Sequence, residues 1–305
     1  MYLPKKPKKW GFKLWGRCSD DGFLNDFAIY QGKGTRVVDD DGVLNCGVAG
    51  NVVLQLCRSL PPDTAYKVFA DNYFSGFALV AEMKKRGLHY TGTINANRLN
   101  NTPLPSEKEL KKEGRGHMSS VYETTNNLSL VRWLDNKCVT LISSYLGTEP
   151  VDNVKRYDKS PKKHIEVARP AIVKEYNAKM GGVGLLDMMS TLYKRLMKSR
   201  RWYMYIFFHM LTVSLVNSFL YKRSCKSLGT KPMAMKIFQS QVAECLKKAG
   251  KPARGRPSSA SPPVRKKTVV VPLPVQDVRY DKIDHLPDVV GTRGRCRLCQ
   301  KAIPK

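Results

Sequence analysis

The chain has 305 residues, of which 42% are hydrophobic, and it carries 53 lysines and arginines against 25 aspartates and glutamates. This composition excludes a wholly disordered chain and allows one large core or two smaller ones. The resulting formal charge of +28 exceeds what solubility requires. It indicates a polyanionic partner, most economically nucleic acid rather than an anionic membrane.

The eight cysteines lie mostly within apolar runs such as residues 53–60. This placement is typical of reduced core residues rather than of a disulfide framework. A basic stretch at residues 4–9 stands where a signal peptide would have its apolar segment, so we expect no secretory signal. Both features predict a reducing compartment.

The first elements form a hairpin and a helix. Two short apolar runs, residues 10–15 and 23–30, flank a turn-forming segment and predict two paired strands. Three adjacent aspartates at 39–41 suggest a metal site, but neighbours in a loop point in different directions, which favours a solvated turn. Residues 48–60 predict an amphipathic helix that ends at Pro61.

A strand–helix–strand unit follows, and Asp71 lies at its first break. Residues 66–70 suit a buried strand, residues 77–88 repeat apolar side chains at helical spacing, and residues 89–94 again resemble a strand. Ligand sites in parallel sheets lie at the carboxyl ends of strands, so Asp71 is placed to meet a ligand or metal. The alternative is that Asp71 merely caps the helix, where Ser75 is also a candidate cap.

The middle of the chain alternates between loops, strands and helices. Residues 98–120 lack an apolar period and predict a loop, whereas residues 129–146 predict a second hairpin anchored by Trp133 within a β-rich insertion. Helices are predicted at 170–180 and at 185–198, with glycines between them.

Residues 202–221 contain no Asp, Glu, Lys or Arg and are flanked by basic residues, so a membrane span is one interpretation. Polar residues such as His209 and Asn217, and aromatic side chains crowded at one end, favour a buried core helix instead. We therefore expect no membrane partner.

From residue 229 the composition becomes that of a polar linker, densest in Pro and Lys over residues 247–267 and predicted to be disordered. It contains Arg-Gly-Arg-Pro, the core of an AT-hook, whose arginines can enter the narrow minor groove of A·T tracts. A solvated linker or a nuclear-import signal explains the same residues. The candidate DNA-binding side chains are Lys251, Arg254, Arg256, Arg265, Lys266 and Lys267.

Cys296 and Cys299 form a Cys-x-x-Cys pair near the carboxyl end, and His285 could supply a third zinc ligand. A structural zinc site needs four ligands, so these residues predict half a site, with two free surface cysteines as the alternative.

Several motifs together resemble the piggyBac family of transposases, over residues 1–223. The motifs that carry the resemblance are Asp71-Asn-Tyr-Phe74, residues 87–98, the Trp-x-Asp-x-Lys segment 133–137, residues 180–187, and the aromatic segment after Arg200-Arg201. The resemblance implies an α/β fold: an RNase H-like core interrupted by a β-rich insertion and followed by a cysteine-rich zinc domain. The implied segments are core 1–98, insertion 99–165, core 166–228, basic linker 229–284 and a truncated zinc-finger-like segment 285–305.

The family's chemistry implies three aspartates that hold two divalent metal ions, usually magnesium, for an in-line attack on a phosphodiester. Asp71 matches the second aspartate. Cys18 stands at the position of the first, Gly184 stands at the position of the third, and Asp187 matches a further acidic position. Two of the three carboxylates are therefore expected to be lost, with Mg²⁺ required only if the chain is active.

The resemblance also implies that residue 1 falls inside a core motif, so that the family's amino-terminal region is expected to be absent. The favoured hypothesis is a transposase-derived nuclear protein that binds DNA without cutting it and could form a homodimer. One alternative is a working nuclease in which Asp20 or Asp21 and Asp187 substitute as acids. Others are a chromatin-interaction protein that binds DNA only through its tail, or a relic without function.

Overall fold

The structure is a computed structural model that describes residues 2, 4, 9–32, 46–99, 101–158, 162–194, 197–225 and 233–251. Its contacts divide the chain into two units, residues 1–247 and residues 248–305, and the second unit is described only as far as residue 251.

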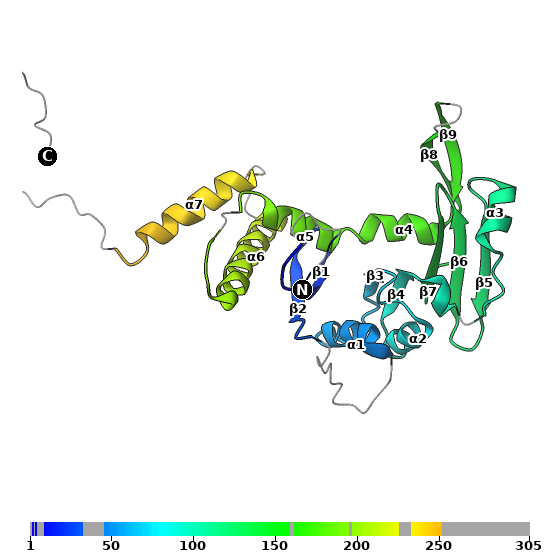
Figure 1. Ribbon diagram of the computed structural model, residues 1–305, viewed down its shortest axis with the longest axis horizontal. Helices are drawn as coiled ribbons and strands as arrows, with labels where there is room; N and C mark the ends of the chain where they lie inside the picture. Colours follow the sequence, from blue (N-terminus) through cyan, green and yellow to red (C-terminus); the bar gives the residue numbers. More distant parts are fainter. Residues whose placement is uncertain are drawn as a thin grey trace, which may run out of the picture. The chain divides into compact units, whose positions relative to one another are not determined.

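A mixed five-stranded sheet organises the first unit (Figure 1), and its strands lie in the order β3-β4-β7-β6-β5. These strands are β3 Lys67–Ala70, β4 His89–Thr93, β5 Met118–Glu123, β6 Leu128–Leu134 and β7 Cys138–Ser143. β3 and β4 are parallel, as predicted for the strand–helix–strand unit, and the other neighbours are antiparallel. Because β4 pairs with β7, this unit and the β6–β7 hairpin form one continuous sheet.

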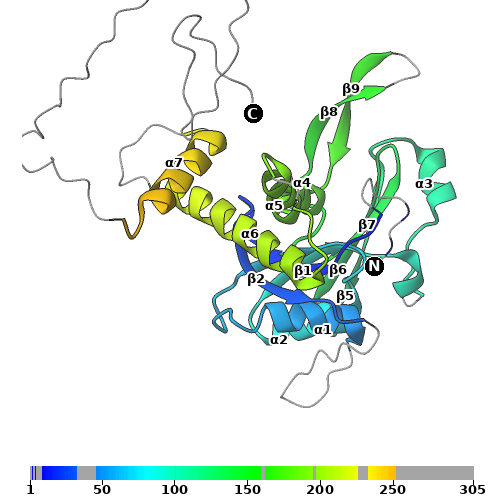
Figure 2. The same ribbon diagram turned by 60° about the vertical axis from the view of Figure 1, so that its left-hand side comes forward.

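Helices cover both faces of the sheet. α1 (Gly47–Leu56) and α2 (Phe77–Lys85) lie side by side in both views (Figures 1 and 2), and α4 (Ala171–Lys179) contacts β4 and β7. Successive side chains of a strand point to opposite faces. Leu130 of β6 therefore packs in the cluster of α1 and α2, while its neighbour Val131 packs with Ile172 of α4.

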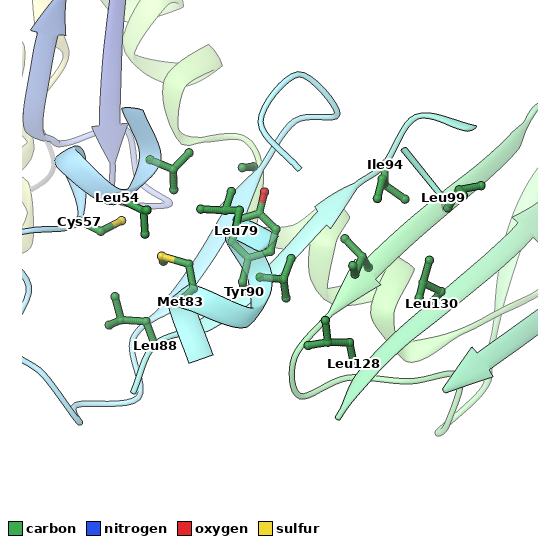
Figure 3. Close-up of a cluster of buried hydrophobic side chains, with 14 residues drawn as sticks. Leu54, Cys57, Leu79, Met83, Leu88, Tyr90, Ile94, Leu99, Leu128 and Leu130 are labelled. Atoms are coloured by element: carbon green, nitrogen blue, oxygen red, sulfur yellow. The ribbon is translucent and has the colours of Figure 1, made fainter. Parts of the chain in front are cut away.

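The core between the sheet and α1 and α2 centres on Tyr90 (Figure 3). Tyr90, Leu79 of α2 and Leu54 of α1 are each at most 1% exposed, which places the strand–helix–strand unit at the most buried part of the fold. Close packing of this kind fixes the backbone of neighbouring segments, including the turn after β3.

Two further hairpins complete the strands. β1 (Leu14–Cys18) and β2 (Leu24–Ile29) form the predicted hairpin, although β1 begins four residues later than the predicted strand at 10–15. β8 (Asp152–Asp158) and β9 (Lys163–Arg169) form another antiparallel pair. Each pair is a separate two-stranded sheet in the part of the chain that the structure describes. The expected RNase H-like arrangement and the boundaries of the insertion stay predictions.

The loop predicted over residues 98–120 is interrupted by a helix and ends in a strand. The short 3₁₀ helix η1 (Ala96–Arg98) ends there, α3 (Glu107–Glu113) follows, and β5 begins at Met118. Ser106 and Glu109 form a capping box, in which each side chain satisfies a backbone N–H of the other residue. This local signal, rather than an apolar period, starts the helix.

Three helices form a second apolar cluster. They are α5 (Gly182–Thr191), α6 (Trp202–Ser224) and α7 (Met235–Lys248). A helix was predicted at 185–198. α5 begins three residues before that predicted start and ends seven residues before that predicted end. α7 corrects the prediction of a disordered linker from residue 229, because Met235 and Phe238 are buried and the Phe238 ring lies 5.6 Å from that of Phe219.

The prediction of a buried core helix at 202–221 is correct only for its second half. Val213, Val216, Phe219 and Leu220 of α6 are buried, whereas Trp202 is 62% exposed and Phe207 is 53% exposed. By length and composition alone α6 could cross a membrane, and 22% of its most apolar 18-residue window is buried. These criteria are also met by helices of soluble proteins, so the expectation of no membrane partner stays a prediction.

Candidate active site

Asp71 occupies the first position of a tight turn that follows β3. Its carbonyl oxygen accepts hydrogen bonds from the backbone N–H groups of Phe74 (3.0 Å) and Ser75 (3.3 Å) and from the Ser75 hydroxyl (3.2 Å). Its carboxylate accepts the backbone N–H of Asn72, and the residue is exposed. The turn thus presents an acidic side chain to solvent at the carboxyl end of a strand.

The capping interpretation is wrong for both Asp71 and Ser75. The N-cap of α2 is Gly76, which makes no side-chain cap, and the helix begins at Phe77. Ser75 is fully buried, and its hydroxyl oxygen lies 2.9 Å from that of Tyr90. Burial raises the pKa of the Tyr90 phenol, so Tyr90 stays protonated and connects the Asp71 turn to β4.

Arg98 holds the same turn from the other side. One guanidinium nitrogen donates to the carbonyl oxygens of Asn72 (3.3 Å), Tyr73 (2.9 Å) and Ser75 (2.8 Å). A charged donor shared by three carbonyl oxygens of one turn fixes their orientation more strongly than a neutral donor would. The backbone beneath Asp71 is therefore held by both Tyr90 and Arg98.

Lys13 connects the beginning of the first hairpin to this turn. Its ammonium nitrogen lies 4.8 Å from the ring centre of Tyr73, 5.1 Å from that of Trp15 and 5.3 Å from that of Tyr30. Phe74 also packs in the cluster of Trp15. These cation–π and apolar contacts bring β1 and the Asp71 turn together.

Cys18, the last residue of β1, lies against the start of α5. A Cβ placed on Gly182 would lie 3.3 Å from the Cβ of Cys18 and would overlap the carbonyl oxygen of Ser19. Burial, followed by the negative charge of Asp187, raises the pKa of the Cys18 thiol to about 11. The structure thus brings together Cys18 and the helix that carries positions 184 and 187.

Gly184 and Asp187 are both exposed on α5. A Cβ on Gly184 would have no other heavy atom within 4 Å, so the position has room for a larger side chain. Besides burial, the negative charge of Asp187 raises the pKa of the Cys18 thiol. Burial lowers the pKa of His209, and the charge of Asp187 partly offsets this lowering.

The two alternative acids in the β1–β2 turn already have partners. The Asp20 carboxylate lies 2.6 Å from the Lys179 ammonium of α4, and this hydrogen bond lowers its pKa. The Asp21 carboxylate accepts the backbone N–H of Phe23 at 3.1 Å and thereby shapes the turn. Both side chains are therefore already engaged through one carboxylate oxygen each.

Within the described residues, no group of three His, Cys, Asp or Glu side chains is close enough to hold a metal ion. Asp71 and Asp187 therefore do not form a ready metal site together with Asp20 or Asp21. A two-metal centre needs several carboxylate oxygens around ions about 4 Å apart, and the side chains present do not fit that requirement.

The predicted tail sites fall outside the described residues, apart from Lys251, which is exposed. The others are Arg254, Arg256, Arg265, Lys266, Lys267, His285, Cys296 and Cys299.

The contributions of Lys13 and Arg98 were not predicted from the sequence. A lysine two residues before a tryptophan in a strand was the available signal for Lys13, because such side chains share a face; Arg98 had no comparable signal.

Comparisons with known proteins identify the family. The family model described as Transposase IS4 matches residues 1–219. The chain is also 30% identical, over 309 aligned residues, to human piggyBac transposable element-derived protein 3. The alignment covers 99% of this chain and 48% of that protein. The chain belongs to the piggyBac family of transposases. Human piggyBac transposable element-derived protein 2 is a second relative, 28% identical over 96% of this chain and 47% of that protein.

A solved piggyBac structure shares the fold. The cryo-EM structure of a piggyBac transposase synaptic complex with hairpin DNA matches with a TM-score of 0.61 and 25% identity, over 83% of this chain and 51% of that one. The chain thus spans about half the length of its piggyBac relatives. The recognition of the piggyBac family and of a mixed α/β fold from sequence motifs is confirmed.

Proposed function

We propose that the chain is a DNA-binding protein derived from a piggyBac transposase and that it does not cleave DNA. The observation that carries the proposal is the pair of residues at 18 and 184, a thiol and a glycine, where the family motif leads us to expect carboxylates. Two-metal phosphoryl transfer requires hard oxygen ligands to hold the ions. Asp71 alone cannot supply them.

The packing of α5 supports the assignment of these two positions to one site. Gly182 touches the end of β1 at Cys18, two residues before Gly184. The Cys18 thiol has a pKa near 11 and stays neutral at neutral pH. A neutral, soft sulfur is a poor ligand for magnesium, and a glycine has no side chain to offer.

An active enzyme would need substitute acids, and their surroundings make this alternative weaker. Asp20 is engaged by Lys179, and Asp21 is engaged by the backbone of its own turn. Asp187 lies about one helical turn beyond Gly184, so its carboxylate would have to replace a ligand from a displaced position.

Charge supports the DNA-binding part of the proposal. The net charge of +28 favours contact with a polyanion, and the solved relative is a transposase in a synaptic complex with hairpin DNA.

We extend the proposal to a nuclear location, a homodimer, and tail contacts through the Arg-Gly-Arg-Pro core. Zinc at Cys296, Cys299 and His285 would be weak or incomplete, because these residues leave the tetrahedron open.

Two measurements test the proposal. A salt titration of the affinity for duplex DNA should show a loss of several decades between about 50 and 200 mM salt if roughly ten phosphate contacts form. Deletion of residues 247–267 then separates the two routes of binding. Retained affinity would favour the core, whereas complete loss would favour the chromatin-interaction alternative in which only the tail binds.

A further inference from the structure

The β8–β9 hairpin is anchored on one face and open on the other. Its inner side chains Val154, Ile165 and Val167 belong to the cluster of Trp133, whose indole N–H donates to the Ala168 carbonyl oxygen at 2.8 Å. Arg156 also faces inward, with its guanidinium 3.0 Å from the Asp135 carboxylate. An isolated two-stranded hairpin is marginally stable, so these contacts hold the ribbon against the five-stranded sheet.

Charged contacts also fix the base of the hairpin. The Arg169 guanidinium donates two hydrogen bonds to the Asp152 carboxylate, at 2.9 and 2.7 Å, across the first pair of the register. Lys174 of α4 adds an ion pair to the same carboxylate at 3.1 Å. Both basic side chains at the base therefore already share one carboxylate.

The other half of the ribbon differs in its charges. Residues 155–158 and 162–166 contain four basic side chains against two acidic ones. Lys155, Lys162 and Lys163 are exposed, and the structure shows no ion pair for any of them within the residues it describes. In the register Lys155 lies opposite Glu166, and Lys163 lies opposite Asp158 on the other face of the ribbon. The exposed ammonium groups make no ion pair with these carboxylates and can meet an external anion.

An aromatic pair stands beside these lysines. Tyr157 and His164 are opposite each other in the register, with ring centres 5.4 Å apart, and Tyr157 is 51% exposed. Cross-strand aromatic pairs stiffen a hairpin near its turn. Lys155 and Lys163 are therefore carried by paired strands, and Lys162 directly precedes β9.

We propose that the free half of the β8–β9 hairpin is a contact surface for the phosphate backbone of double-stranded DNA, through Lys155, Lys162 and Lys163. This inference rests on the proposed DNA-binding function and assigns part of it to a defined surface. A two-stranded ribbon fits the dimensions of the major groove of B-DNA, and lysine ammonium groups along its edge reach phosphates without reading bases. Binding through this surface is independent of DNA sequence.

The test compares two triple variants of the full chain with equal loss of charge. The first carries Lys155→Gln, Lys162→Gln and Lys163→Gln; the control carries Lys108→Gln, Lys112→Gln and Lys236→Gln on exposed positions of α3 and α7. Fluorescence anisotropy with a labelled mixed-sequence duplex about three helical turns long gives the affinity as a function of salt. Circular dichroism and thermal unfolding verify that each variant folds.

For the hairpin variant we expect the slope of log affinity against log salt to become shallower by about 2 to 3, and the affinity at about 0.1 M salt to fall at least tenfold. The control should change the slope by less than about 1. If the triple variant fails to fold, the Lys162→Gln and Lys163→Gln pair replaces it, with an expected change of about 2.

The possible failures are distinguishable. Equal slopes for the hairpin variant and the unaltered chain, or equal losses in both triple variants, would overturn the assignment to the hairpin and leave the proposed function standing. Absence of DNA binding by the unaltered chain would overturn both.

Discussion

Gly182, the first residue of α5, lies directly against Cys18, the last residue of β1. A Cβ on Gly182 would be 3.3 Å from the Cβ of Cys18 and would overlap the carbonyl oxygen of Ser19. The contact joins the two chain segments that the piggyBac resemblance assigns to the first and third carboxylates. It is therefore the local geometry on which the account of a lost metal site depends.

The Gly182→Ala change should lower the free energy of unfolding by about 1–3 kcal/mol, because an added methyl group in filled space forces the backbone to shift. Gly184→Ala is the matched control in the same helix, since its Cβ has no heavy atom within 4 Å. It should raise the free energy of unfolding by about 0.5–1 kcal/mol through helix propensity. Urea unfolding followed by circular dichroism measures both, and similar effects of the two changes would contradict the packing described.

The combined change Cys18→Asp and Gly184→Asp should recover metal binding that neither single change produces. Two carboxylates added beside α5 would supplement Asp71, whereas one leaves too few oxygen ligands. Calorimetric titration with Mn²⁺ checks this independently of activity, and cleavage of a duplex with Mg²⁺ checks the chemistry. Addition of Asp71→Ala to the double variant should abolish both signals. Equal metal affinity of a single and the double variant would contradict the shared site.

Removal of the Arg98 guanidinium should loosen the turn that carries Asp71. Arg98→Ala leaves three carbonyl oxygens without their charged donor, which should cost about 1–3 kcal/mol of stability. Hydrogen exchange should become faster at the amides of Phe74 and Ser75, which bond to Asp71. Arg132→Ala, which removes another arginine bonded to a backbone carbonyl, is the control. Unchanged exchange at Phe74 and Ser75 would count against the role of Arg98.

Stability should fall as the pH rises through the alkaline range, in part because of Cys57. Burial raises the pKa of its thiol to about 11, above the ordinary value of about 8.5, so the folded state keeps a proton that the unfolded state releases. Its contribution is fully present below about pH 8.5 and is lost as the pH approaches 11. Cys57→Ala should flatten this dependence in urea unfolding, and the exposed Cys245→Ala should not. Identical pH profiles for both variants would refute the effect of burial.

Sequence patterns predicted the strand–helix–strand unit and the β6–β7 hairpin because their apolar periods are strong. Asp71 was correctly placed at the end of β3 for the same reason. Apolar periodicity missed α3, because only one leucine of this helix is buried and its start is defined by the capping box of Ser106 and Glu109. Amphipathic spacing in α7 was obscured by its low hydrophobicity, although Phe238 and Met235 repeat on one face.

Tertiary contacts set the limits of the site prediction. Cys18 and Gly184 were named from motif positions, but no local pattern indicates that Gly182 packs on β1. The engagement of Asp20 by Lys179 joins residues 159 positions apart. Because such a pair depends on how α4 meets the hairpin, it could not be predicted from spacing.

The most direct test of the central claim measures binding and cleavage in one reaction. Labelled duplex DNA is saturated with the unaltered chain, as judged by anisotropy, and then incubated with Mg²⁺ or Mn²⁺ before the strands are separated under denaturing conditions. The account predicts bound and intact DNA, with no difference between the unaltered chain and Asp71→Ala. Strand cleavage that requires the metal and disappears in Asp71→Ala would contradict it.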